Sequence, residues 1–309
     1  MGKKILIAVG DCIYSKYAAK YAARISQAAQ DLTYTLFNVQ AAIPSIFTEA
    51  ANNNPEIQAE IDTLVRERSE TSKCVVGELK DLLIENGVPS NRIEVVTEPM
   101  QAGTAKDILN RAKKGSYDAI VLACKGLTPR RDFLVGTTAS NVIDHALETS
   151  IWIIDEDTNS LDVMVAVDGS ESSFRALNHV ISMVGANPNL RLVLFHVLPY
   201  LSHFYSPDFE RRNPNLQKLI QEKDQKQMGR FFSKALEKLE EAGIKKSQVE
   251  IKTDIHGYDI STAILGEARK GQYGTLVVGR RGERDAFFTG RIAMRLSKKM
   301  PTPALWIVA

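Results

Sequence analysis

The chain repeats itself, and this repeat limits its possible folds more than any other feature. The segment "VMVAVDGSESS" at 163–173 has the same shape as "KKILIAVGDCIYS" at 3–15, an apolar run followed by a turn and a helix start. Further matches lie 154 to 158 residues apart, among them "TLFNVQ" (35–40) with "VLFHVL" (193–198) and "SIWIID" (150–155) with "PALWIVA" (303–309). The chain therefore consists of two similar halves.

Each half alternates strand-like and helix-like segments. In the first half the pattern predicts strands near 4–9, 33–39, 92–97, 118–123 and 150–154, and helices near 15–30, 57–86, 104–114 and 137–147. Strands that alternate with helices need crossover connections, which favour a parallel sheet covered on both faces. We therefore predict an α/β fold of two doubly wound, Rossmann-like, five-stranded parallel-sheet domains in tandem.

A short acidic stretch separates the halves, so we expect domains at 1–155 and 162–309 with a linker at 156–161. The short linker and the apolar final strands favour an intramolecular pseudo-dimer in which the strands of Trp152 and Trp306 meet, because each would otherwise be an exposed edge. Whether two copies of the chain also pair is left open. The proline-containing segments 41–55 and 199–215 are expected to be irregular surface loops near the strand ends.

Composition excludes several function classes. A net charge of +2 and the lack of a basic run with interleaved aromatic residues argue against nucleic-acid binding. The apolar run at the N-terminus is too short for a signal peptide, and no apolar stretch is long enough to span a bilayer. The 3 cysteines form no C-x-x-C pair and the 5 histidines have no metal-ligand spacing. These features predict a cytoplasmic protein without a metal site.

A glycine-containing segment, "ACKGLTPRRDFLVGTTASNV", follows the fourth strand of the first half. Its Gly126 and Gly136 allow backbone amides to approach a ligand closely, and Gly136-Thr137 opens a helix, whose start presents unpaired N–H groups to an anion. Thr137 adds a hydroxyl donor. Positive charge is added by Lys125, Arg130 and Arg131. These residues are typical of a phosphate-binding loop.

The spacing resembles the G-x2-G-x9-G-[ST] motif of the universal stress protein family, whose first strand often ends in aspartate. The resemblance covers nearly the whole chain, once per half. It implies a domain fold like that of the adenine nucleotide alpha hydrolases, binding of ATP or AMP by many members, with or without Mg²⁺, and pairing through the last strands.

Both halves depart from the family motif. In the first half, Ala123 replaces the first glycine, and Gly10 occupies the aspartate position with Asp11 one residue late. In the second half Asp168, Gly279 and Gly282 match, but only seven residues separate Gly282 from Gly290, and Arg291 replaces the hydroxyl residue. The halves have thus lost complementary features.

The resemblance implies a set of nucleotide-binding positions. Asp168 would accept hydrogen bonds from the nucleoside, and the backbone at the end of each second strand would meet the adenine. The expected positions are Asp168, Gly169, Val197, Gly279, Gly282, Gly290 and Arg291 in the second half, and Val39, Gly126, Gly136 and Thr137 in the first.

Structural alternatives stand beside these assignments. Asp168 is equally well explained as the N-cap of a helix at 171–184, and the glycines as loop-shaping residues. Three functions remain open. The first is a stress-response regulatory module that binds an adenine nucleotide, and the second is an interaction or adaptor protein with degenerate sites. The third is a weak ATPase, for which the sequence offers no general base.

Overall fold

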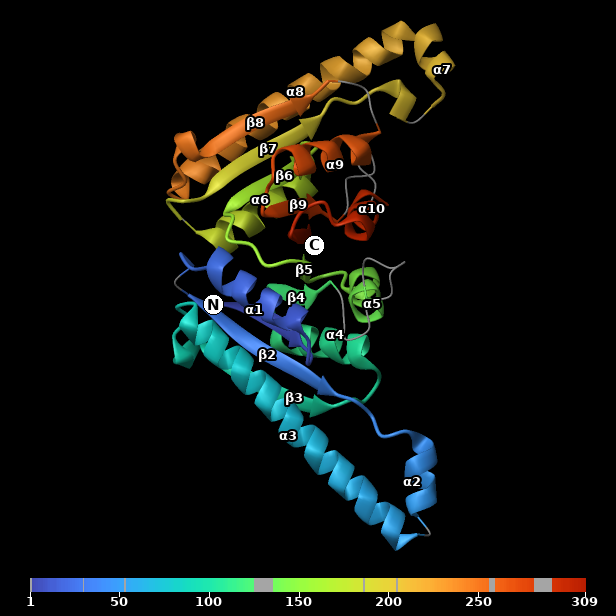
Figure 1. The fold of residues 1–309 in the computed structure, drawn as a ribbon. Helices are drawn as coiled ribbons and strands as arrows, with labels where there is room; N and C mark the ends of the chain where they lie inside the picture. Colours follow the sequence, from blue (N-terminus) through green and yellow to red (C-terminus); the bar gives the residue numbers. More distant parts are fainter. Residues whose placement is uncertain are drawn as a thin grey trace. The chain divides into compact units, whose positions relative to one another are not determined.

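The computed structural model describes residues 2–29, 31–52, 54–124, 136–185, 187–203, 205–255, 259–280 and 291–309, without the side chain of Arg291. The chain divides into two compact units (Figure 1). The first comprises Met1–Arg24 and Asp31–Thr149, and the second comprises Ile25–Gln30 and Ser150–Ala309. Both contain a parallel sheet with helices between its strands, which confirms the predicted α/β class.

The first unit is built on four parallel strands in the order β3-β2-β1-β4. The central strands are continuous apolar runs because helices cover both faces of the sheet. The strands are β1 (Lys3–Val9), β2 (Leu32–Gln40), β3 (Ile93–Pro99) and β4 (Ala119–Ala123). The helices are α1 (Ile13–Ile25), α2 (Ser45–Ala51), α3 (Pro55–Glu85), α4 (Thr104–Gly115) and α5 (Thr137–His145), with a 3₁₀ turn η1 (Ser90–Arg92).

The second unit contains five parallel strands in the order β10-β9-β6-β7-β8, with β5 added beside β10. The strands are β5 (Ser150–Ile154), β6 (Asp162–Val167), β7 (Arg191–Val197), β8 (Val249–Asp254), β9 (Thr275–Gly279) and β10 (Ala304–Val308). The helices are α6 (Glu171–Val184), α7 (Pro207–Arg212), α8 (Pro214–Glu241), α9 (Ile260–Lys270) and α10 (Arg291–Lys299), with 3₁₀ turns η2 (Leu201–His203) and η3 (Lys246–Gln248).

The two tryptophan-containing strands pair, as the sequence predicts. β5, which the repeat assigns to the first half, runs antiparallel to β10 within the second unit, and Trp152 lies opposite Trp306. Their rings stack with centroids 3.9 Å apart and planes 2° from parallel. The Trp152 Nε1–H also donates to Nε2 of His179 on α6 at 3.0 Å. Both indole rings are fully buried, so this pair is part of the core.

The topology of the second unit fixes where a ligand would bind. The chain runs from β6 outward to β7 and β8, then returns to β9 on the other side of β6. Right-handed crossovers place α6 and α8 on one face and α9 and α10 on the other, and each pair is in contact (Figure 1). The strand order therefore switches between β6 and β9, and open α/β sheets generally bind ligands at the carboxyl ends of the strands beside such a switch.

The two segments expected to be irregular contain short helices, so that prediction was wrong in part. The segment 41–55 forms α2, and 199–215 forms η2 and α7. In α7 the Ser206 side chain accepts a hydrogen bond from the Phe209 N–H, and Pro207 takes the first helical position. Proline is favoured there because its missing N–H would have no partner in the first turn. These prolines mark helix starts as well as loops.

None of the helices in the described part of the chain is long and apolar enough to cross a membrane.

Candidate functional site

Asp168 lies in a tight turn between β6 and α6. Gly169 adopts a φ of +75°, a left-handed conformation that favours glycine. Oδ1 of Asp168 accepts hydrogen bonds from the Ser170 N–H at 3.0 Å and the Ser173 hydroxyl at 2.6 Å. The Ser173 Oγ in turn accepts from the Asp168 N–H at 2.9 Å. The carboxylate is therefore held by one oxygen, and Oδ2 has no hydrogen bond to another described residue.

The N-cap of α6 is Ser170, not Asp168. The Ser170 side chain accepts from the Ser173 N–H, which satisfies an otherwise unpaired donor of the first turn. The alternative that Asp168 is the N-cap of α6 was thus wrong, although its carboxylate does order the turn that precedes the helix.

The first half keeps one hydrogen bond of this turn, but neither the carboxylate nor a left-handed residue at the position of Gly169. The Gly10 N–H donates to the Ser15 hydroxyl at 3.0 Å, as Asp168 does to Ser173. Gly10 thus occupies the position of Asp168 and offers no side-chain acceptor. Asp11 takes the position of Gly169 and is exposed to solvent.

Several predicted residues of the second half share the carboxyl edge of the sheet. Ala166 on β6 pairs with Val278 on β9, so Asp168 follows β6 next to the end of β9 at Gly279. Val197 ends β7, the neighbouring strand on the other side of β6, and is buried. Because parallel strands end on the same side, all three positions lie at the same edge of the sheet.

The first half places its predicted residues at the equivalent edge. Val39 lies near the end of β2 and is partly exposed. Gly136 is the N-cap of α5 and its N–H donates to the Cys124 carbonyl at 2.6 Å, while Thr137 is exposed in the first turn. The remaining predicted residues Gly126, Gly282 and Gly290 lie outside the described residues, as does the side chain of Arg291.

Gly279 has a packing neighbour that the sequence did not indicate. A Cβ at this position would overlap Oγ of Ser172 in the first turn of α6, and would lie 3.0 Å from both Cβ and the carbonyl oxygen of Ser172. The close approach that this glycine permits in the structure is thus between β9 and α6. The Ser172 hydroxyl is buried and has no hydrogen-bond partner among the described residues.

A buried histidine and aspartate lie behind the turn and were not predicted as a pair. His196 on β7 contacts the Val167 carbonyl oxygen through Nδ1 at 3.0 Å and Oδ2 of Asp224 on α8 through Nε2 at 2.9 Å. From the sequence, His196 stood out only as part of a repeated strand. The feature of the sequence that could have indicated the pair is Asp224, a charged residue on the same helix face as Met228 and Phe231, which are both buried.

A charged cluster on the α9 side of the sheet has shifted pKa values. A hydrogen bond to Glu267 at 2.8 Å raises the pKa of Lys252, and partial burial opposes this shift. Burial alone would raise the pKa of Glu267, but hydrogen bonds from Lys252 and Tyr273 lower it overall. Tyr273 precedes β9, at the opposite end of that strand from Gly279, so this cluster stabilises the fold away from the candidate site.

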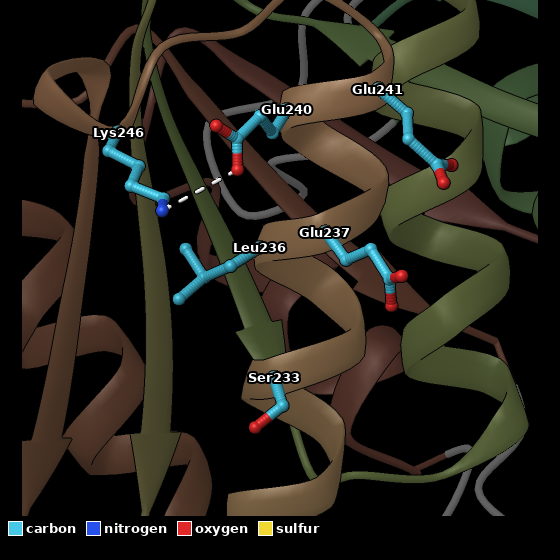
Figure 2. Close-up of a pocket in the computed structure, with 6 residues that line it drawn as sticks. All are labelled: Ser233, Leu236, Glu237, Glu240, Glu241 and Lys246. Atoms are coloured by element: carbon cyan, nitrogen blue, oxygen red, sulfur yellow. Dashed lines mark ion pairs between the residues drawn. The ribbon is translucent and has the colours of Figure 1, made fainter.

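A shallow depression lies on the outer side of α8. Figure 2 shows Lys246 reaching Glu240 at 3.5 Å, while the carboxylates of Glu237 and Glu241 point away from it. Lys246 belongs to η3, which leads into the start of β8, so the depression is at the opposite end of the sheet from Asp168. The depression has three carboxylates and a single lysine, which is already paired with Glu240, and this charge balance disfavours a phosphate. Across the described residues, no group of three or more His, Cys, Asp and Glu side chains is arranged to hold a metal ion.

Comparison with known proteins agrees with this architecture. The model of the universal stress protein family matches residues 1–148 and again residues 161–307. The chain belongs to the universal stress protein family. It has two of the family's domains in tandem, as the repeat indicates. No curated protein matches the chain.

Solved structures of similar length share the fold. A universal stress protein from Archaeoglobus fulgidus is 17% identical with a TM-score of 0.63, and the match covers 99% of this chain and 97% of that one. A putative universal stress protein from Pseudomonas aeruginosa is 14% identical with a TM-score of 0.58, covering 99% and 93%. At these identities the likeness supports the tandem fold and does not assign a ligand.

Proposed function

We propose that this universal stress protein binds an adenine nucleotide, ATP or AMP with or without Mg²⁺, at the carboxyl edge of the second-half sheet. Its role would be that of a cytoplasmic regulatory module in a stress response. The observation that carries the proposal is the Asp168 carboxylate, which is fixed through Oδ1 and leaves Oδ2 for a ligand. A partly buried, oriented acceptor of this kind suits the hydroxyl or amino donors of a nucleoside.

The other parts of the proposed site surround this carboxylate. Gly169 and Val197 offer backbone at the ends of β6 and β7, where the adenine would lie. The segment from Gly279 through Gly282 and Gly290 to Arg291 connects β9 to α10, and the start of a helix favours an anion. We assign the phosphates to this segment, with Arg291 supplying charge in place of the missing hydroxyl.

The second candidate function is an interaction protein without a ligand. The observation that favours it is the first half, where Gly10 replaces the aspartate although the backbone hydrogen bond to Ser15 is kept. One half has therefore kept the fold while losing a feature of the site. We propose a binding role and not an enzymatic one, because no described residue at the edge combines with a second group to activate water.

The test is calorimetric titration of the full chain with ATP and with AMP. Asp168→Asn is the sharp variant, because its amide oxygen retains the acceptor for Ser170 and Ser173 while an NH₂ group replaces Oδ2. Loss of that acceptor is expected to weaken binding by about 1–3 kcal/mol. The matched control is Asp11→Asn in the first half, which is expected to leave affinity unchanged.

Two outcomes would overturn the proposal. If Gly136→Val abolishes binding while Asp168→Asn leaves it intact, the nucleotide binds in the first half. If the wild-type chain binds neither nucleotide, and mass spectrometry of the denatured purified protein detects none, the interaction-protein function replaces the proposal.

A further inference from the structure

One face of α8 lies against the turn that contains Asp168. The Gln227 side-chain amide donates to the Asp168 carbonyl oxygen at 3.2 Å. Met228 lies over Gly169, where an added Cβ would be 3.1 Å from its sulfur. Asp224 precedes Gln227 by three residues and Met228 by four, so it lies on the same face of α8. α8 therefore contacts the turn directly through Gln227 and Met228, and it carries Asp224 on the same face.

His196 connects Asp224 to the peptide that precedes Asp168. The Val167 carbonyl oxygen only accepts hydrogen bonds, so Nδ1 of His196 is its donor. Nε2 lies 2.9 Å from Oδ2 of Asp224, so one further proton lies between these two atoms. His196 is 3% exposed and Asp224 is 9% exposed, and water therefore competes little with either bond.

This contact fixes the orientation of Asp168 because a peptide unit is planar. Holding the Val167 carbonyl oxygen also holds the Asp168 N–H, which points the opposite way and donates to Ser173. The two hydrogen bonds together set the direction in which the Asp168 side chain leaves the backbone.

The first half shows what remains when the link is absent. Asn38 occupies the position of His196 and donates from Nδ2 to the Val9 carbonyl oxygen at 2.9 Å. Its Oδ1 is buried without a hydrogen-bond partner among the described residues. Arg68, 156 residues before Asp224, bonds the carbonyls of Ala41 and Ala42 instead. Among the described residues of the first half, Gly10 offers no carboxylate at the turn and Asn38 makes no hydrogen bond to the long helix α3.

We infer that His196 is a positioning residue of the second-half site, and that Asp224 on α8 holds it in place to direct the Asp168 carboxylate toward the ligand. This inference rests on the proposed function in that it assigns the residue a part in nucleotide binding. It adds α8 to the elements whose position decides affinity.

The experiment compares Asp224→Ala with Asp224→Asn in the full chain. The alanine variant removes the link, whereas the introduced amide still donates to Nε2 of a neutral His196, so the link is retained. Leu239→Val is the matched control, because Leu239 is buried on α8 four turns away from Asp224. Each variant is titrated with ATP and with AMP. Hydrogen exchange of segment 168–173 is also measured without nucleotide.

We expect Asp224→Ala to weaken nucleotide binding roughly tenfold, the effect of losing one buried hydrogen bond, and to speed exchange of 168–173. Asp224→Asn is expected to bind within about twofold of the wild type and to exchange at its rate. Leu239→Val is expected to change neither quantity. If both Asp224 variants match the wild type, or if Leu239→Val has the effect of Asp224→Ala, the positioning role is refuted.

The exchange measurement separates this inference from the proposed function. If the wild type binds no nucleotide, the proposed function fails, and faster exchange of 168–173 in Asp224→Ala alone still supports the positioning of the turn. If the wild type binds and Asp224→Ala binds equally well, the proposed function stands and the inference fails.

Discussion

Gly279→Ala is expected to destabilise the second unit, because the space beside this glycine is already filled by α6. An added Cβ would overlap Oγ of Ser172 and lie 3.0 Å from both its Cβ and its carbonyl oxygen. The hydroxyl can rotate away, but the Cβ and carbonyl oxygen are held by the helix, so α6 must shift. Overpacking of this kind costs about 1–3 kcal/mol.

A second substitution tests the cause. Ser172→Ala removes the overlapping oxygen, which is buried without a hydrogen-bond partner among the described residues, and is expected to be neutral or slightly stabilising. In the double variant, part of the Gly279→Ala cost should disappear, with a coupling of at least about 0.5 kcal/mol. The remaining cost reflects the Cβ and carbonyl contacts, which the second substitution does not relieve.

The assay is urea unfolding followed by tryptophan fluorescence. The chain has 2 tryptophans and both lie in the second unit, so the signal reports on that unit. Gly266→Ala is the control, because no heavy atom lies within 4 Å of the place that its Cβ would take, and alanine is expected to stabilise the helix by up to about 1 kcal/mol. If Gly279→Ala is as harmless as Gly266→Ala, or its cost is unchanged by Ser172→Ala, the packing argument is wrong.

Three further predictions concern the core, the charged cluster and catalysis. Trp152→Phe should lower the free energy of unfolding in urea by about 1 kcal/mol more than Trp306→Phe does, because of the two indoles only Trp152 donates its Nε1–H to an acceptor among the described residues. Equal losses in the two variants would contradict this. The pKa of Glu267 is lowered and that of Lys252 is raised, so their ion pair stabilises the folded state fully between about pH 5 and pH 10. This stabilisation is lost as the pH falls through the Glu267 pKa, or as it rises beyond the ordinary pKa of lysine. Lys252→Met should therefore lower stability across that range and match the wild type more closely near pH 3, which unfolding curves at several pH values would check. The purified chain should release phosphate from ATP no faster than a mock preparation does. If it hydrolyses ATP, and a substitution in the segment between β9 and α10 abolishes this activity, the protein is an enzyme and the prediction is wrong.

The apolar runs, their alternation with helical segments and the repetition of this pattern were enough to predict the architecture. Apolar runs such as "AIVLA" at 119–123 are strands because each must bury side chains on both faces, and this requirement is local to the segment. Alternation with helices then requires crossovers and parallel pairing, and crossover handedness leaves few topologies. The strand ranges, the longer helices α1, α3, α4 and α5 of the first half, and the meeting of the tryptophan strands were therefore predictable.

The short helices and the helix cap were less accessible from the sequence. Pro207 and Ser206 are common both in loops and at helix starts, and only the contacts of α7 with its neighbours decide between them. Asp168 and Ser170 are both good N-cap residues, separated by a single glycine. The hydrogen bond from the Ser173 N–H to the Ser170 side chain identifies Ser170 as the cap, and Gly169 provides the left-handed turn before it.

The sequence by itself determined that the ends of the strands, and with them Asp168, Val197 and Gly279, lie at one edge of the sheet, since parallel strands end on the same side. Only the tertiary structure decided what each residue contacts there. Gly279 faces Ser172, and Asp168 is tied to α8 through His196 and Asp224, although these partners are tens of residues or more apart along the chain. Contacts between a strand end and a distant helix depend on how the layers pack, and no local pattern of residue types records that packing.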